Sequence, residues 1–234
     1  MKIAGLCLVV TATLLVTARG DLTIVQKVEG SGSVSQITIK LKGERVRVEI
    51  NPQLTTIIEN KSGDMLTLMN KEKKFLRITA DKSKAIAEMA SKYSAKTAGA
   101  AEGAKLSATG KKEMINGYEA EEYVREAPSF KATYWISSNY PDSAAIVKQL
   151  QAIIPSAWND AAKGMLDYRD FPGLPLRSKV KLNGKEITST ITSIKQDLLS
   201  DEEFSVPKDF QEMKVPNLQD MMTEKPSASI SSRP

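Results

Sequence analysis

Two runs of alternating apolar and polar residues, joined by Asn183-Gly184, constrain the fold of this chain most strongly. Before this pair, valine and leucine alternate with lysine. After it, Ile187 and Ile191 share one side, opposite a row of threonines. An Asn-Gly pair between two alternating runs is the strongest short-range signal for a β-hairpin. The sequence therefore predicts two antiparallel strands here, each with one apolar face.

The same pattern recurs along most of the chain, which predicts a meander of short antiparallel strands. The two cleanest runs place Ile37, Ile39 and Leu41, and then Val46 and Val48, opposite charged or polar residues. Such alternation is typical of a sheet that buries one face only. The other predicted strands lie near residues 22–28, 54–58, 65–69, 75–79, 106–108, 111–125 and 130–136. We expect a curved sheet that resembles an incomplete barrel.

Helical spacing appears in two segments, which makes the expected class α+β. Residues 81–105 are rich in alanine and lysine, and residues 142–166 carry an apolar stripe interrupted by Pro155. We expect the second segment to form a helix pair against the concave face of the sheet. The expected organisation is one β-rich domain over residues 21–213, followed by a disordered serine- and proline-rich tail over 214–234.

The first twenty residues have the pattern of a secretory signal peptide. A positive start is followed by an apolar run and by small residues before Asp21, so cleavage is expected after Gly20. The apolar run is shorter than the roughly 20 residues that cross a bilayer. We therefore expect no transmembrane span in the mature chain and a periplasmic or extracellular location. Cleavage removes Lys2, Arg19 and the single cysteine, and lowers the net charge from +5 to +3.

The composition offers few groups for catalysis. The chain has no histidine, and its single cysteine lies in the signal segment. A weakly basic chain with interspersed acids is not suited to nucleic acid. The densest acidic cluster is Glu119, Glu121 and Glu122, which we interpret as a solvated strand face flanked by basic residues. The acids after Ser200 fit a capping box with Glu203 as its fourth member. We expect no metal and no cofactor.

Aromatic and apolar residues of the second half suggest a cleft under the helix pair. They have two interpretations: plain core, or the lining of a site for a lipid or another apolar ligand. The candidate lining residues are Tyr134, Trp135, Ile146, Leu150, Ile154, Trp158 and Met165.

Several segments resemble an exported bacterial family known as domain of unknown function 4412. The resemblance rests on INGYEAEEY, ATYWIS, FPGLPLRSKV and EEFSVPKDFQEM, and more loosely on ITIKLKGERVRVEI in the first half. It implies no established activity. The order of meander, helix and meander is also similar in layout to periplasmic lipoprotein carriers, which implies an incomplete barrel around acyl chains.

Together these features predict an exported cell-envelope protein that binds a hydrophobic ligand or a protein partner without catalysis. Two alternatives remain open at this point. One is a hydrolase that uses carboxylates only, and the other is a purely structural component of the envelope.

Overall fold

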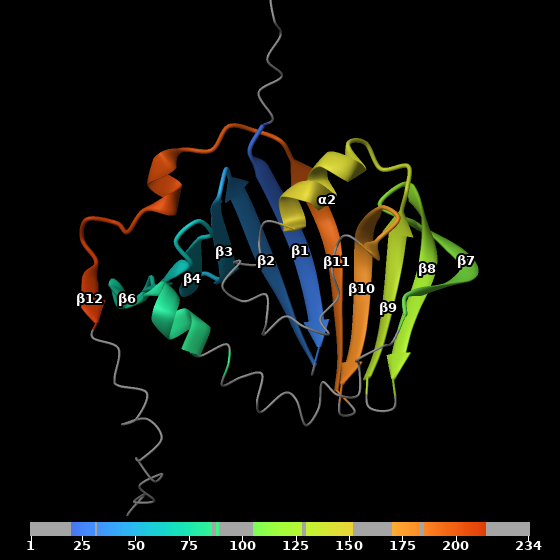
Figure 1. Cartoon of the computed structure of the whole chain (residues 1–234), viewed down its shortest axis with the longest axis horizontal. Helices are drawn as coiled ribbons and strands as arrows, with labels where there is room; N and C mark the ends of the chain where they lie inside the picture. The colour runs from blue at the N-terminus through green and yellow to red at the C-terminus, as the bar shows by residue number, and fades with distance from the viewer. Residues whose placement is uncertain are drawn as a thin grey trace, which may run out of the picture.

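The computed structural model describes residues 20–30, 32–85, 88, 105–127, 130–151, 170–182 and 185–213. Its main feature is one open, curved sheet of twelve strands, with α2 lying across one face (Figure 1). The strand order is β12-β6-β5-β4-β3-β2-β1-β11-β10-β9-β8-β7. The expected curved antiparallel sheet is thus confirmed, and the described residues are mostly β.

The first half of the chain forms a six-stranded antiparallel meander. Each strand pairs with the next because short turns at polar residues separate runs that alternate in polarity. Gly43 and Gly63 adopt positive φ angles in two of these turns. The strands are β1 (Leu22–Gly30), β2 (Ser33–Lys42), β3 (Arg45–Asn51), β4 (Leu54–Glu59), β5 (Asp64–Met69) and β6 (Lys74–Ile78).

The second half forms another antiparallel group, which joins the first through a central hairpin. The strands are β7 (Ser107–Ile115), β8 (Tyr118–Ala127), β9 (Phe130–Ser137), β10 (Leu174–Leu182) and β11 (Lys185–Lys195). The hairpin predicted around Asn183-Gly184 is confirmed by the pairing of Leu182 with Lys185, although the turn lies outside the described residues. β10 pairs with β9 and β11 pairs with β1, so this hairpin connects the two meanders into one sheet.

The predicted helices are described only in part. Residues 80–85 and Glu88 are helical and Lys105 is not, while the rest of 81–105 lies outside the described residues. The helix predicted over 142–166 begins as α2 (Ser143–Gln151), and residues 152–166 lie outside the described part. The packing of a helix pair on the concave face therefore remains a prediction beyond α2.

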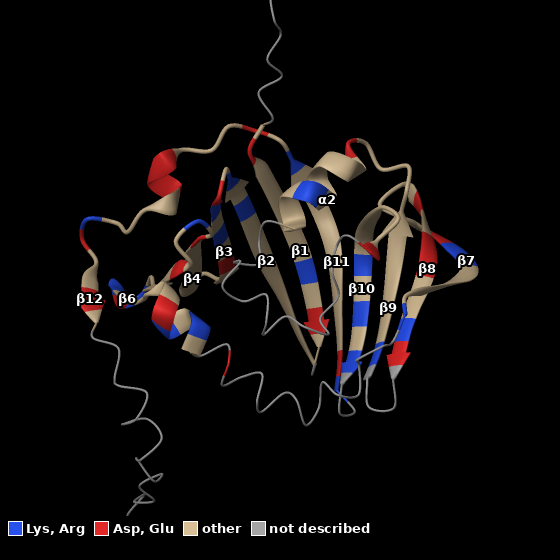
Figure 2. Ribbon diagram, viewed as in Figure 1, with Lys and Arg blue, Asp and Glu red and all other residues tan. Residues whose placement is uncertain are grey.

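After β11 the chain crosses the outer face of the first meander. This segment, residues 197–213, is called the C-terminal strap below. It contains the 3-10 helix η3 (Asp201–Phe204) and ends in β12 (Gln211–Met213), which pairs in parallel with β6. Figure 2 shows the acidic residues of η3 in red and basic residues of β3 in blue. The sequence pattern predicted neither β12 nor this crossing, because three exposed residues carry no usable alternation.

Candidate functional site: the apolar concave face

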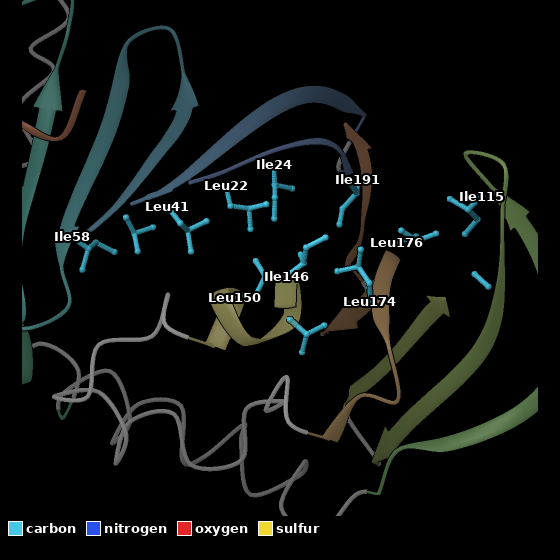
Figure 3. Packing of buried hydrophobic residues seen from close by; sticks show 13 residues of the cluster. Leu22, Ile24, Leu41, Ile58, Ile115, Ile146, Leu150, Leu174, Leu176 and Ile191 are labelled. Atoms are coloured by element: carbon cyan, nitrogen blue, oxygen red, sulfur yellow. The ribbon is translucent and has the colours of Figure 1, made fainter. Parts of the chain in front are cut away.

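The concave face of the sheet carries the largest cluster of buried apolar side chains in the described part of the chain (Figure 3). Both halves of the sheet contribute, because β11 and β1 lie side by side at its centre. We call this set the concave cluster. Its buried members are Leu22, Ile24, Leu41, Val46, Ile58, Ile115, Ala120, Ile146, Val147, Leu150, Leu174, Leu176 and Ile191.

Helix α2 covers part of this cluster. Its residues Ile146, Val147 and Leu150 are buried, and their spacing places them along one helical stripe. The chain turns into the helix at Asp142, whose φ is 54°, and the Asp142 carbonyl accepts a bond from Ile146 N at 3.0 Å. The apolar stripe noticed in the sequence therefore points toward the sheet, as expected for Ile146 and Leu150.

Two local features bring β7 and β8 into the same cluster. The Asn116 side chain donates a hydrogen bond to the Ile191 carbonyl, so the β7–β8 turn lies against β11. The register of β10 shifts between Pro175 and Arg177, opposite β9. Such a bulge increases local twist and curvature. The sheet consequently curls enough for Ile115 to join residues of the first meander.

Apolar side chains that keep some exposure surround the buried core of the cluster. Three of them, Ile39, Val48 and Met65, lie on β2, β3 and β5, whereas α2 packs mainly against β10. The remaining partly buried members are Tyr118, Trp135, Tyr140 and Ile194. The concave face thus has partly exposed apolar side chains on strands other than β10, and at β5 the Ser83 hydroxyl lies 3.7 Å from the Met65 sulfur.

Tyr118 and Tyr140 form a contact next to α2. Their ring centroids lie 4.5 Å apart with the planes tilted by 48°, a favourable geometry for two aromatic rings. Burial raises the pKa of the Tyr140 hydroxyl, and the neighbouring Tyr118 adds to this effect. The pair connects the start of β8 with the loop that precedes α2.

Trp135 packs against the concave cluster and carries a polar contact on its ring. The Arg177 guanidinium lies 5.4 Å from the ring centroid, a cation–π geometry, and Arg177 Nη1 bonds Glu113 Oε1 at 2.7 Å. Arg177 Nε also donates to Thr190 Oγ1 at 3.3 Å. A charged group therefore borders the apolar surface, with its own carboxylate partner.

Tyr134 lies elsewhere, although it is adjacent to Trp135 in the sequence. It belongs to a separate cluster with Ala132 and Ile136, and its ring lies 5.1 Å from that of Phe171. Consecutive strand residues point to opposite faces, so Tyr134 and Trp135 are not brought together. Of the other predicted lining residues, Ile146 and Leu150 belong to the concave cluster. Ile154, Trp158 and Met165 lie outside the described residues.

The acidic cluster on β8 is occupied by neighbouring polar groups. Glu119 bonds Lys112 Nζ at 2.8 Å, which raises the pKa of that lysine, and Glu121 accepts from the Tyr123 hydroxyl at 3.2 Å. Glu122 accepts from Thr109 Oγ1 at 3.0 Å. Within the described ranges, no three acidic, histidine or cysteine side chains gather as metal ligands.

Among the described residues, no helix is both long enough and apolar enough to span a membrane.

A curved, mostly antiparallel open sheet with an apolar concave face is thus the class that the fold and site define. The family model for Domain of unknown function (DUF4412) matches residues 19–210, so the chain belongs to this family. The resemblance seen in the sequence segments is confirmed. No curated protein matches the chain.

Several solved structures are similar to this chain at low identity. PNGF-II in its P21 crystal form shares 13% identity and a TM-score of 0.41, over 86% of this chain and 33% of that one. This protein thus spans about a third of PNGF-II. A DUF1329 family protein from Desulfovibrio piger shares 11% identity and a TM-score of 0.31, over 80% and 90% of the two chains. The Mycobacterium tuberculosis lipoprotein LppX shares 11% identity and a TM-score of 0.36, over 79% of this chain and 91% of that one. Similarity of this extent does not define a function.

Proposed function

We propose that this protein is an exported, non-catalytic binding protein for a hydrophobic ligand, which lies on the concave face of the sheet. The observation that carries the proposal is the concave cluster and its partly exposed apolar surroundings on β2, β3 and β5. Apolar sites with few polar groups are typical of small-molecule binding. The first twenty residues, of which the structure describes only Gly20, supply the sequence pattern for export.

The energetics favour a ligand with a long apolar chain. Burial of apolar surface contributes roughly 25 cal/mol per Å², or about 0.8 kcal/mol for each CH₂ group. An acyl chain that covers Ile39, Val48 and Met65 would gain several such contributions without needing a polar partner for its chain. Only a head group would need one, and Arg177, whose guanidinium lies beside the Trp135 ring, is a cationic side chain at the border of the concave cluster.

The proposal of a non-enzyme rests on the chemistry of the available side chains. The chain has no histidine, and its single cysteine is Cys7. The carboxylates of Glu119, Glu121 and Glu122 each contact a lysine or a hydroxyl group on the surface of β7 and β8. We therefore favour binding over carboxylate-based hydrolysis, with the structural envelope component as the remaining alternative.

Titration of the purified protein with a fluorescent fatty acid tests the proposal. We expect saturable binding by the wild type and by Trp158→Phe, in which Trp135 is the sole tryptophan and its emission changes as the ligand binds. Met65→Asp should bind at least about tenfold more weakly, because a charge then lies against the acyl chain and about 1.4 kcal/mol corresponds to a factor of ten.

Met114→Asp is the matched control, because Met114 is exposed on β7 and its side chain is not part of the concave cluster. It should bind as the wild type does, and circular dichroism should show that both aspartate variants are folded. Absence of saturable binding by the wild type contradicts the proposal and favours a structural role. Equal loss of binding in Met65→Asp and Met114→Asp contradicts the placement of the ligand on the concave face.

A further inference from the structure

The C-terminal strap is held on the outer face of β2 and β3 mainly by ionic contacts. The Glu203 carboxylate pairs with Lys40, and the Asp201 carboxylate pairs with Arg45 and, at 3.1 Å, with Lys42. Arg47 Nη1 also donates to the Glu203 carbonyl at 2.7 Å. Alternation on β2 and β3 places these basic residues opposite the side that contributes Leu41 and Val46 to the concave cluster.

One apolar side chain of the strap, that of Phe204, is buried. Phe204 is only 6% exposed and lies in a second cluster with Ile57, Leu68 and Phe75, which we call the outer cluster. The Arg45 guanidinium lies 5.2 Å from the Phe204 ring centroid, so the same residue contacts both the carboxylate and the ring. Partly buried Leu66, Leu199, Val206 and Phe210 pack around this cluster.

The far end of the strap adds only a short strand to the sheet edge. Gln211 N donates to the Lys73 carbonyl at 3.0 Å, and Lys73 Nζ pairs with Asp209 at 2.9 Å. β12 pairs with β6 at three positions, whereas β1 and β11 pair at eight. At the near end Leu198 is 86% exposed, and side chains hold the backbone of Leu199: its N–H donates to Asp21 Oδ2 at 2.9 Å, and its carbonyl accepts from Lys42 Nζ at 2.6 Å. The strap thus depends on side-chain contacts far more than on a strand ladder.

We propose that the C-terminal strap opens as one unit while the rest of the sheet stays folded, and that ionic strength and acid promote this opening. Opening uncovers the outer cluster and frees the edge of β6. It is independent of ligand binding on the concave face. Segments with few buried apolar contacts and few ladder bonds open at lower free energy than the global unfolding transition.

The charges on the strap explain why both salt and acid should promote its opening. Salt screens exposed ion pairs, and the Asp201 carboxylate is exposed. The hydrogen bond from Lys40 lowers the pKa of the Glu203 carboxyl, and the Ser200 N–H and Arg47 add to this effect. Glu49 pairs with both Lys40 and Arg47. The hydrogen bonds from Arg45 and Lys42 lower the pKa of Asp201. Lowered pKa values mean that both carboxylates stabilise the closed strap above about pH 4.5, and that this stabilisation is lost as the pH falls through the lowered values.

Hydrogen exchange of the full chain, followed by mass spectrometry, tests the proposal. We expect the amides of Phe210 and Gln211 to exchange faster than those of β1 and β11 in the wild type. In the double variant Asp201→Asn, Glu203→Gln, exchange within 199–213 should accelerate a further fivefold or so. The β1 and β11 amides should keep their wild-type rates.

Asp197→Asn is the matched control, because Asp197 is an exposed strap carboxylate that makes no ion pair with the described residues. It should exchange as the wild type does. Phe204→Ala provides a second variant that removes apolar contact instead of charge, and it should accelerate the same peptides. The proposal is overturned if strap and β1–β11 amides exchange at one common rate in every variant. Equal rates in the Asn control and the double variant would also overturn it.

Discussion

Ile57 and Ile58 are consecutive residues of β4, yet they are buried in different clusters on opposite faces of the sheet. Ile58 belongs to the concave cluster, and Ile57 lies in the outer cluster beside Phe204. A strand buried on both faces is unusual in an antiparallel sheet, which commonly leaves one face in water. The strap is the element that covers the second face here.

This arrangement predicts selective coupling between side chains. Ile57→Ala and Ile58→Ala should each lower the free energy of unfolding by about 2–5 kcal/mol, because each removes buried volume. Combined with Phe204→Ala, the Ile57 substitution should be non-additive by at least about 0.5 kcal/mol, since the two share one cluster. The effects of Ile58→Ala and Phe204→Ala on the free energy of unfolding should add to within about 0.5 kcal/mol. Urea denaturation of the two cycles measures both quantities, and identical coupling in the two cycles would contradict the assignment of faces.

Gly173 is predicted to tolerate no side chain. A Cβ atom at this position would lie 2.4 Å from the Ser137 carbonyl oxygen, and backbone atoms cannot yield as a flexible side chain does. Gly173→Ala should therefore lower the free energy of unfolding by about 1–3 kcal/mol, the usual cost of overpacking. Thermal denaturation checks this, with Ser138→Ala as the exposed control. Equal stability of the two variants would show that the loop before β10 can move.

Asn116 is predicted to act in two ways, which two substitutions separate. Its φ of 52° lies in the left-handed region, and its side chain donates to the Ile191 carbonyl. Asn116→Gly keeps the backbone conformation and loses only the hydrogen bond, worth about 1 kcal/mol. Asn116→Ala loses the bond and also strains the backbone by about 1–2 kcal/mol. Urea unfolding should therefore rank wild type above Gly and Gly above Ala. The reverse order of the two variants would rule out this account.

Tyr140 is predicted to ionise at higher pH than an ordinary tyrosine. Burial raises its pKa in the folded protein, so the neutral hydroxyl is favoured there. The corresponding stability is fully present below the usual tyrosine pKa of about 10, and it is lost as the pH rises through the raised value. Burial also raises the pKa of Tyr123, so absorbance titration of tyrosinate should show a late part that becomes smaller, without vanishing, in Tyr140→Phe. A titration curve whose late part is unchanged by this substitution would refute the prediction.

Much of the sheet could be predicted from local pattern. The alternation in β2 and β3 and the Asn-Gly pairs marked strands and hairpins, because each strand residue reports its own face through its polarity. The stripe of Ile146 and Leu150 on α2 also pointed to the correct partner surface. By contrast, aromatic character alone places Tyr134 and Trp135 in the lining of one cleft, whereas strand geometry puts adjacent residues on opposite faces.

The acids after Ser200 show where local reasoning stops. A capping box explains part of their role, since Ser200 Oγ accepts from Glu202 N and Glu203 accepts from the Ser200 N–H. Their partners Lys40 and Arg45 lie more than 150 positions away in the chain. No periodicity connects such distant segments. The only signal in the sequence was the charged face of β2 and β3, together with a segment far along the chain, after Ser200, that is both acidic and aromatic.

The amino-acid sequence by itself determined which residues alternate, where the strands turn and which side of most strands is apolar, because these depend on neighbours two to four positions apart. Only the tertiary structure decided that β11 pairs with β1, which joins the two halves into one sheet, and that the strap covers the outer face. Those choices depend on contacts between distant segments, whose shape and charge must fit at the same time.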